Sequence, residues 1–327
     1  MRKYRTAGWK PPRPRKTSGV EGYAQVQPPK QDALAFAKMA GGGNDFVVLD
    51  NRAAKIGDAG ELTRRISTRA LSVGADGLIL VESSARATFR MRYYNSDGGL
   101  AAFCANGTRC AARFAFLNVI AGRKMTVETD AGIVGAEIGD GGAVTLSLPS
   151  PYEFRARRPL VVGEQTVGEQ TVHGSSIVVG VPHYVVFLRG ELWPHDIVPL
   201  GRALRAHREL APDGANVNFV SIRDRHAIEV RTYERGVEGE TLSCGSGVVA
   251  SAVVSGLFGR VESPVAVRTR SGITLEVSFR IDGGHADEVR LKGDARLIYR
   301  ATITPETLEG FDPEFVRDPA ARVTVPS

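Results

Sequence analysis

Cysteine is scarce in this sequence, and the few cysteines lie far apart. There are three among 327 residues, an odd and small number that argues against a disulfide framework and for a reducing compartment. A zinc site would need closely spaced pairs, whereas Cys104 and Cys110 are six residues apart and Cys244 is remote. We therefore expect no structural disulfides and no bound metal.

The sequence also lacks a long uncharged apolar run that could span a membrane, and no apolar segment follows the early basic residues as it would in a secretory signal. No phosphate-binding P-loop is present. The glycine-rich stretch GGGNDF lacks the spacing and the β-α-β context of a dinucleotide site. These absences predict a cytoplasmic chain with no membrane partner.

Beyond the first 32 residues, the chain has no excess of positive charge. Residues 1–32 carry eight Lys or Arg against two acidic residues, which accounts for the whole net charge of +6. The same segment holds five prolines and little to bury. We expect a disordered, basic, proline-rich tail, either solvated or touching an anionic partner, and no nucleic-acid partner for the body of the chain.

Two stretches place a cysteine before a glycine turn that runs into small and apolar residues: FCANGTRCAARF and SCGSGVVASAVV. Cys104 and Cys244 are 140 positions apart, as are Gly107 and Gly247. Other landmarks recur in the same order at nearly the same offset, GADGLILV with GANVNFVS and MRYYN with VRTYE. This pattern predicts an internal duplication whose two copies each end in a cysteine-capped helix.

Many short strands with one or two helices per copy, and no strict β-α-β alternation, indicate an α+β fold. We expect helices at 58–73, with Leu71 among its apolar positions, and around 196–209. The segment around 149–159 is the expected link between the copies. The remaining apolar stretches, including 33–39, 160–190 and 216–233, are expected to be strands.

A cysteine at a helix start lies near the positive end of the helix dipole, where its thiolate is favoured. If the two copies face each other, one thiolate removes a proton from carbon and the other thiol returns one to the opposite face, while helix-start amides stabilise a carboxylate. For a lone cysteine, a small buried hydrophobe is the more common role. We expect that role for Cys110, and a thiol hydrolase using His183 would leave the second cysteine unexplained.

Six ordered motifs together resemble diaminopimelate epimerase: GGGNDFVVLD, GADGLILVE, NSDGGLAAFCANGTRCAARF, GVPHYVVF, GANVNFV and YERGVEGETLSCGSG. The resemblance implies two pseudo-symmetric α+β domains, each a strongly curved, mostly antiparallel sheet around a central helix. It implies the interconversion of L,L- and meso-diaminopimelate for lysine and peptidoglycan synthesis. It also implies a homodimer with a small amino-acid substrate and no cofactor.

The resemblance implies a first domain of residues 33–148 plus 291–303, a second domain of residues 149–290, and tails at 1–32 and 304–327. It makes Cys104 and Cys244 the acid/base pair, with His183 and Glu234 beside them as catalytic residues. The implied substrate contacts are Asn44, Asn95, Ala105, Asn106, Asn216, Glu234, Arg235, Gly245 and Ser246. On residue type alone, the asparagines could equally form turns, Glu234 and Arg235 a surface ion pair, and His183 the end of a strand.

Three positions depart from the family pattern. Val181 stands where asparagine often precedes Pro-His, Gly77 where many members carry glutamine, and Ala105 where glycine usually follows the first cysteine. Ala105 keeps the backbone N–H that the chemistry needs. Val181 and Gly77 affect the far end of the substrate, so a related racemase acting on another amino acid, such as histidine, stays open. A non-catalytic binding protein is the third alternative, although binding alone needs no pair of thiols.

Overall fold

The computed structural model describes residues 34–163 and 170–308. The expected basic tail at 1–32 and residues 309–327 of the expected C-terminal tail lie outside the described residues. Residues Pro305–Leu308 form a short helix, α6, and Leu308 packs against the apolar cluster under α1. Within the described residues, no helix is long and apolar enough to cross a membrane.

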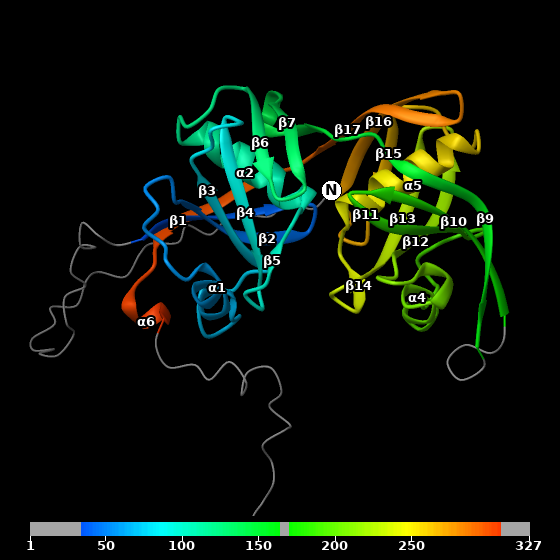
Figure 1. Cartoon of the computed structure of the whole chain (residues 1–327), viewed down its shortest axis with the longest axis horizontal. Coiled ribbons are helices and arrows are strands. Elements are labelled where there is room, and N and C mark those ends of the chain that lie inside the picture. Colours follow the sequence, from blue (N-terminus) through cyan, green and yellow to red (C-terminus); the bar gives the residue numbers. More distant parts are fainter. Residues whose placement is uncertain (1–33, 164–169, 309–327) are drawn as a thin grey trace, which may run out of the picture. The chain divides into compact units, whose positions relative to one another are not determined.

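The first half of the described chain, residues 34–148, has two α-helices among short strands (Figure 1). Its elements are β1 (Ala35–Gly41), β2 (Asn44–Asp50), α1 (Ala59–Ser67), β3 (Gly77–Glu82), β4 (Phe89–Asn95), β5 (Leu100–Ala101), α2 (Ala105–Leu117), β6 (Lys124–Thr129), β7 (Gly132–Ile138) and β8 (Val144–Ser147).

The second half, residues 149–293, repeats this order after one additional strand, and a final strand follows it. Its elements are β9 (Tyr152–Val162), β10 (Gln170–Val179), β11 (Val181–Phe187), α4 (Val198–Arg205), β12 (Asn216–Asp224), β13 (Ala227–Glu234), β14 (Gly239–Thr241), α5 (Gly245–Leu257), β15 (Val265–Arg268), β16 (Thr274–Asp282) and β17 (His285–Gly293), followed by β18 (Arg296–Thr302).

Strand pairing is the same in the two halves, which confirms the predicted duplication. In the first, β1–β2 is antiparallel, β2–β3 parallel, β3–β4 antiparallel, β4–β6 parallel, and β6–β7–β8 antiparallel. The second half repeats this series with β10–β11, β11–β12, β12–β13, β13–β15 and β15–β16–β17. Each parallel pair is reached by a crossover, through α1 or α4 for the first and through α2 or α5 for the second. The fold is α+β, as predicted.

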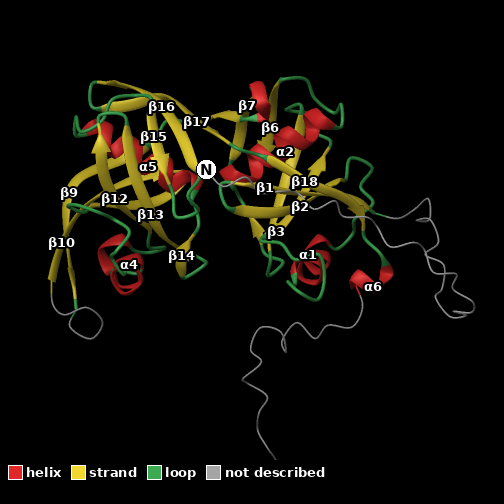
Figure 2. Cartoon of the chain, turned by 180° about the vertical axis from the view of Figure 1, so that it is seen from behind, coloured by secondary structure: helices red, strands yellow, loops and turns green. Residues whose placement is uncertain are grey.

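One helix in each half is surrounded by strands because nearly all its sides are apolar or small. All of α5 from Val248 to Gly256 is buried, and α2 is buried from Ala105 to Ala112. A helix without a polar face has to be enclosed by other elements. In both views α2 and α5 lie among the strands, whereas α1 and α4 lie outside them (Figures 1 and 2). Cys110 is fully buried in this core, as predicted.

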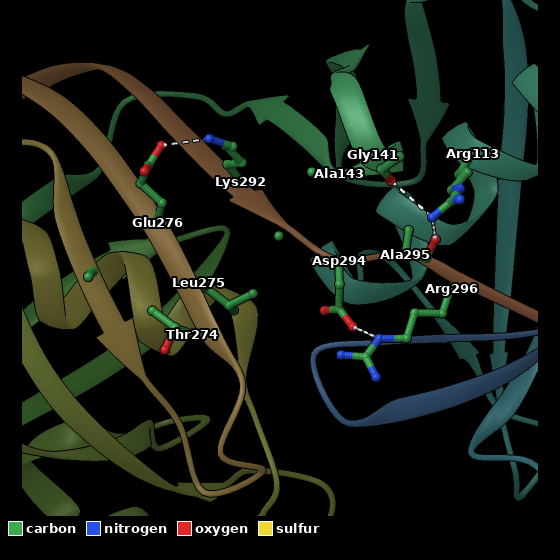
Figure 3. A pocket seen from close by; sticks show the side chains of 13 residues that line it. Arg113, Gly141, Ala143, Thr274, Leu275, Glu276, Lys292, Asp294, Ala295 and Arg296 are labelled. Atoms are coloured by element: carbon green, nitrogen blue, oxygen red, sulfur yellow. Dashed lines mark hydrogen bonds and ion pairs between the residues drawn. The ribbon is translucent and has the colours of Figure 1, made fainter.

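The segment between β17 and β18 connects the halves. β17 pairs with β8, and β18 pairs with β1 at the other end of the chain. A pocket of about 430 Å³ lies beside this crossing. Figure 3 shows its walls, where Arg113 donates to the carbonyl of Ala295 and Arg296 pairs with Asp294. None of the residues predicted for the functional site lines this pocket.

Three sequence-based boundaries were wrong. The helix expected at 58–73 ends at Ser67, and Leu71 is exposed because the chain turns through Ala70 at a φ of 68°. The helix expected around 196–209 covers only Val198–Arg205. Most of the expected link at 149–159 belongs to β9, whose pairing with β10 is a contact between distant segments that composition does not reveal.

Candidate active site

Both predicted cysteines occupy the N-cap position of a buried helix. Cys104 precedes α2, and its Sγ accepts a hydrogen bond from the backbone N–H of Gly107 at 3.4 Å. Cys244 precedes α5, and its Sγ lies 3.5 Å from the hydroxyl of Ser246. The backbone is extended at both caps, so each cysteine directly precedes the free amides of the first helical turn. Each thiol therefore lies where a helix start can stabilise negative charge.

The two helix starts are in contact with each other. The Asn106 side chain of α2 donates to the carbonyl of Ser243, which precedes Cys244, at 3.4 Å. A β-carbon added at Gly245 would lie 2.7 Å from the β-carbon of Ala105. The structure therefore brings Cys104, Ala105 and Asn106 together with Cys244 and Gly245, as the two-thiol hypothesis requires.

Burial outweighs the helix starts in setting the thiol pKa values. Burial raises the pKa of Cys104 to about 11, against the opposing effect of the Gly107 amide, and the charge of Glu234 raises it further. Burial and Glu234 also raise the pKa of Cys244. The helix start lowers the pKa of Cys104, as expected, but burial has the larger effect and favours the thiol form at both cysteines.

Glu234 and Arg235 follow directly on the end of β13, beside Cys244. Burial raises the pKa of the Glu234 carboxyl, and the neighbouring Thr241 and Cys244 side chains oppose this effect. The backbone N–H of Arg235 donates to the side chain of Asn216 at 2.7 Å. Arg235 is half-buried and lies 3.8 Å from Asp213. Glu234, Arg235 and Asn216 thus form one connected group on the Cys244 side.

His183 is almost completely buried on β11, in register with Asn216 on β12. Burial, together with the charge of Arg235, lowers the pKa of His183 to about 3, so the ring is neutral. Its Nδ1 lies 3.1 Å from the amide nitrogen of Asn218, and the oxygen of that amide accepts from Thr232. Nδ1 is therefore the acceptor, and the ring proton lies on Nε2, which has no partner among the described residues.

On the other side, a chain of amides positions Asn44 and Asn106. The buried guanidinium of Arg109 donates to Oδ1 of Asn106 at 2.7 Å, which leaves Nδ2 of Asn106 to donate to Asn44 at 2.8 Å. Asn44 in turn donates to Asp76 at 2.9 Å. Gly42 adopts a φ of 64°, and a β-carbon there would lie 2.6 Å from Asn106. Glycine is thus required for this arrangement.

Asn95 is the least connected of the predicted residues. It is exposed at the end of β4, directly opposite Gly77 on β3. Val181 is half-buried and lies two residues before His183 on β11, where it places an apolar side chain near that ring. No group of His, Cys, Asp and Glu suited to holding a metal ion occurs within residues 34–163 and 170–308.

Sequence reasoning missed Arg109 and Asn218, which orient Asn106 and His183. A signal existed for each. Arg109 is one of two arginines in a helix rich in small and apolar residues, and it is fully buried, so its charge needs dedicated partners. Asn216 and Asn218 alternate along β12, so both side chains lie on the same face of the strand.

Comparison with known proteins agrees with this arrangement. The family model for diaminopimelate epimerase matches residues 36–150 and 175–298. The diaminopimelate epimerase of Aquifex aeolicus is 40% identical over 288 residues, which cover 84% of this chain and all of that protein. The corresponding protein of Chlorobaculum tepidum is 41% identical over 269 residues, 81% of this chain and all of that protein.

The chain belongs to the diaminopimelate epimerase family. The fold extends beyond this family: a hydroxyproline epimerase from Agrobacterium vitis superposes with a TM-score of 0.65 at 18% identity, covering 85% of this chain and 94% of the other. At that identity the likeness shows a shared fold. Membership in the diaminopimelate epimerase family makes the chain an isomerase.

Proposed function

We propose that this chain interconverts L,L- and meso-diaminopimelate, with Cys104 and Cys244 as the two acid/base groups. The observation that carries the proposal is the contact between the two cysteine-capped helix starts. A carboxylate between them meets amides from both helices, and the adjacent carbon lies between two sulfurs. Such amides stabilise the negative charge that develops when the α-proton leaves.

The proton balance uses the two thiols and no other co-reactant. One sulfur, as thiolate, takes the α-proton and becomes a thiol; the other thiol gives its proton to the opposite face of the carbanion and becomes a thiolate. After one turnover the two sulfurs have exchanged states, which prepares the site for the reverse direction. Acid and base therefore change roles with the isomer that is bound.

The surrounding groups account for how a thiolate forms in a site that favours thiols. Glu234 lies beside Cys244, and burial raises the pKa of its carboxyl, so it is suited to accept the Cys244 proton. His183 keeps its proton on Nε2, so its uncharged ring serves as a hydrogen-bond donor. In this proposal Asn44, Asn95, Asn106, Asn216 and Arg235 contact the substrate. Three residues at the helix starts complete the site with backbone or hydroxyl donors: Ala105, Gly245 and Ser246.

A cytoplasmic homodimer that needs no cofactor is the remaining part of the proposal, and it rests on the family resemblance. Light scattering of the full chain would measure the oligomeric state, and a monomer at working concentration would contradict the dimer. Adding pyridoxal phosphate or a chelator to the assay would test cofactor independence, because neither should change the rate.

The decisive experiment follows α-proton exchange in D₂O by NMR, with reduced protein and L,L-diaminopimelate. Deuterium incorporation with formation of the meso isomer, lost in both Cys104→Ala and Cys244→Ala, is the expected result. Exchange with another amino acid but not with diaminopimelate would favour a racemase of different specificity and direct attention to Val181 and Gly77. Absence of exchange with any amino acid would overturn the proposal.

A further inference from the structure

Tyr93, on a strand that adjoins the start of α2, has a hydroxyl group that the proposed mechanism does not use. It lies on β4 in alternation with Phe89 and Met91, so the three side chains lie on one face of the strand and belong to the core cluster around α2. A β-carbon on Gly107, in the first turn of α2, would lie 3.2 Å from Met91 and 3.6 Å from the β-carbon of Cys104. This face of β4 therefore adjoins the start of α2.

Gly77 provides the space that the Tyr93 ring occupies. A β-carbon at Gly77 would collide with the backbone carbonyl oxygen of Tyr94, and it would lie 2.7 Å from the ring of Tyr93 and 3.2 Å from its hydroxyl oxygen. The ring also packs edge-on against Phe46, with centroids 5.7 Å apart, and Phe46 is in register with Gly77 across β2 and β3. The ring thus lies across β3 between two neighbouring strands, and a side chain at position 77 would collide with both the ring and the backbone of β4.

The hydroxyl of Tyr93 is a neutral group in negative surroundings. Burial raises its pKa, and the charges of Cys104, Asp76, Glu234 and Asp97 raise it further. The phenol therefore keeps its proton under any working condition of the enzyme. Among the described residues no side-chain hydrogen bond contributes to the pKa of this hydroxyl, and none is formed by it. Its oxygen is not among the fully buried polar atoms that lack a partner, so it is both unpaired and accessible, which leaves it open to a ligand.

We propose that Tyr93 is a substrate-binding residue whose hydroxyl oxygen accepts a hydrogen bond from the amino group on the reacting carbon, next to Cys104. The inference rests on the proposed function, because it names a contact in the same site. The proposed site includes the carboxyl of Glu234, which favours a cationic ligand group, and an ammonium has three donors to satisfy. A neutral phenol binds that group without adding a negative charge, which would further disfavour the Cys104 thiolate.

Tyr93→Phe tests the contact, because it removes the hydroxyl and keeps the ring that packs on Gly77 and Phe46. The matched control is Tyr94→Phe. Tyr94 is the next residue on β4, and it belongs to the separate apolar cluster on the α1 side. Steady-state α-exchange would be measured for the wild type and both variants, with thermal unfolding to confirm that each folds.

We expect Tyr93→Phe to raise KM about 10- to 100-fold, the range for losing a hydrogen bond to a charged group, with kcat changed far less. The pH profile of kcat should be unchanged, because the phenol transfers no proton. Tyr94→Phe should match the wild type. The same increase is expected with 2-aminopimelate, which lacks the second amino group, because the contact is at the reacting carbon.

Three results would overturn the inference while leaving the epimerase assignment intact: an unchanged KM in Tyr93→Phe, an equal change in Tyr94→Phe, or an effect that disappears with 2-aminopimelate. A wild-type chain that exchanges no amino acid would overturn the inference and the proposed function together. If the wild type exchanges a different amino acid, the proposed function alone fails, and the KM comparison with that amino acid decides the role of Tyr93.

Discussion

The contact between the two helix starts has space for one methyl group, and Ala105 already supplies it. A β-carbon at Gly245 would lie 2.7 Å from that of Ala105, whereas carbon atoms pack at about 3.5–4.0 Å. The other neighbours of this position, Asn106 and Leu291, are at 3.5 Å and need not move. Gly245→Ala should therefore push the two cysteine-bearing helix starts apart by about 1 Å.

The size of the effect follows from this displacement. Overpacking a core site costs about 1–3 kcal/mol, so the free energy of unfolding should fall by that amount. A 1 Å misplacement of catalytic groups can reduce the rate by about 10²-fold. Activity should thus fall much more steeply than stability, because the thiols have to reach the same carbon from opposite faces.

A double variant distinguishes this explanation from general damage. Ala105→Gly removes the methyl group that the new one would meet, so Ala105→Gly combined with Gly245→Ala should recover most of the lost exchange rate and stability. α-Deuterium exchange and thermal unfolding of the wild type, both single variants and the double variant complete the cycle. The explanation fails if Gly245→Ala is as active as the wild type, or if the double variant is no more active than Gly245→Ala alone. Either result would show that contact between the β-carbons at positions 105 and 245 does not control the activity.

The other predictions address the thiols and His183. Cys104→Ser and Cys244→Ser should each abolish epimerisation, while Cys110→Ala should keep it and lower stability by about 1 kcal/mol; an active Cys104→Ser enzyme would contradict the two-thiol mechanism. Because the pKa of His183 falls from 6.5 to about 3 on folding, its contribution to stability is present above pH 6.5 and is lost as the pH falls toward 3. Acid should therefore lower the unfolding temperature of the wild type more than that of His183→Gln, and parallel curves would refute this. The Asn218→Asp carboxylate would accept a hydrogen bond from Nδ1–H and so favour the tautomer with no proton on Nε2, so kcat should fall by about 10²-fold or more with the fold retained; an unchanged kcat would show that the tautomer is irrelevant.

The repeated cysteine motif made much of this fold predictable. Several motifs recur at the offset that separates Cys104 from Cys244, and the two halves have the same strand order. The duplication and the two capped helices therefore followed from the sequence. Their pairing across the site did not follow, because it depends on contacts such as Asn106 to Ser243 that join segments 137 residues apart. The thiol pKa values were missed for a related reason: helix position is local, whereas burial depends on the whole fold.

The supporting residues were harder to predict than the reactive ones. Arg109 and Asn218 act through Asn106 and His183, and neither belongs to a motif with its own chemistry. Tyr93 reads in the sequence as an ordinary strand aromatic. Its ring lies against Gly77. The sequence shows only that position 77 has no side chain, and the structure shows that the Tyr93 ring lies in that space.

The pairing of β18 with β1 also determines when, during synthesis of the chain, the fold can be completed. β1 is among the first folded segments to leave the ribosome, and its partner is among the last, more than 250 residues later. Until then β1 has a free edge, and the carboxylate of Asp294, which accepts from the Gly42 amide, has not been made. A nascent chain that stops short of β18 therefore contains both cysteines and both capped helices but lacks the strand that connects its ends. Activity should appear only when synthesis is nearly complete.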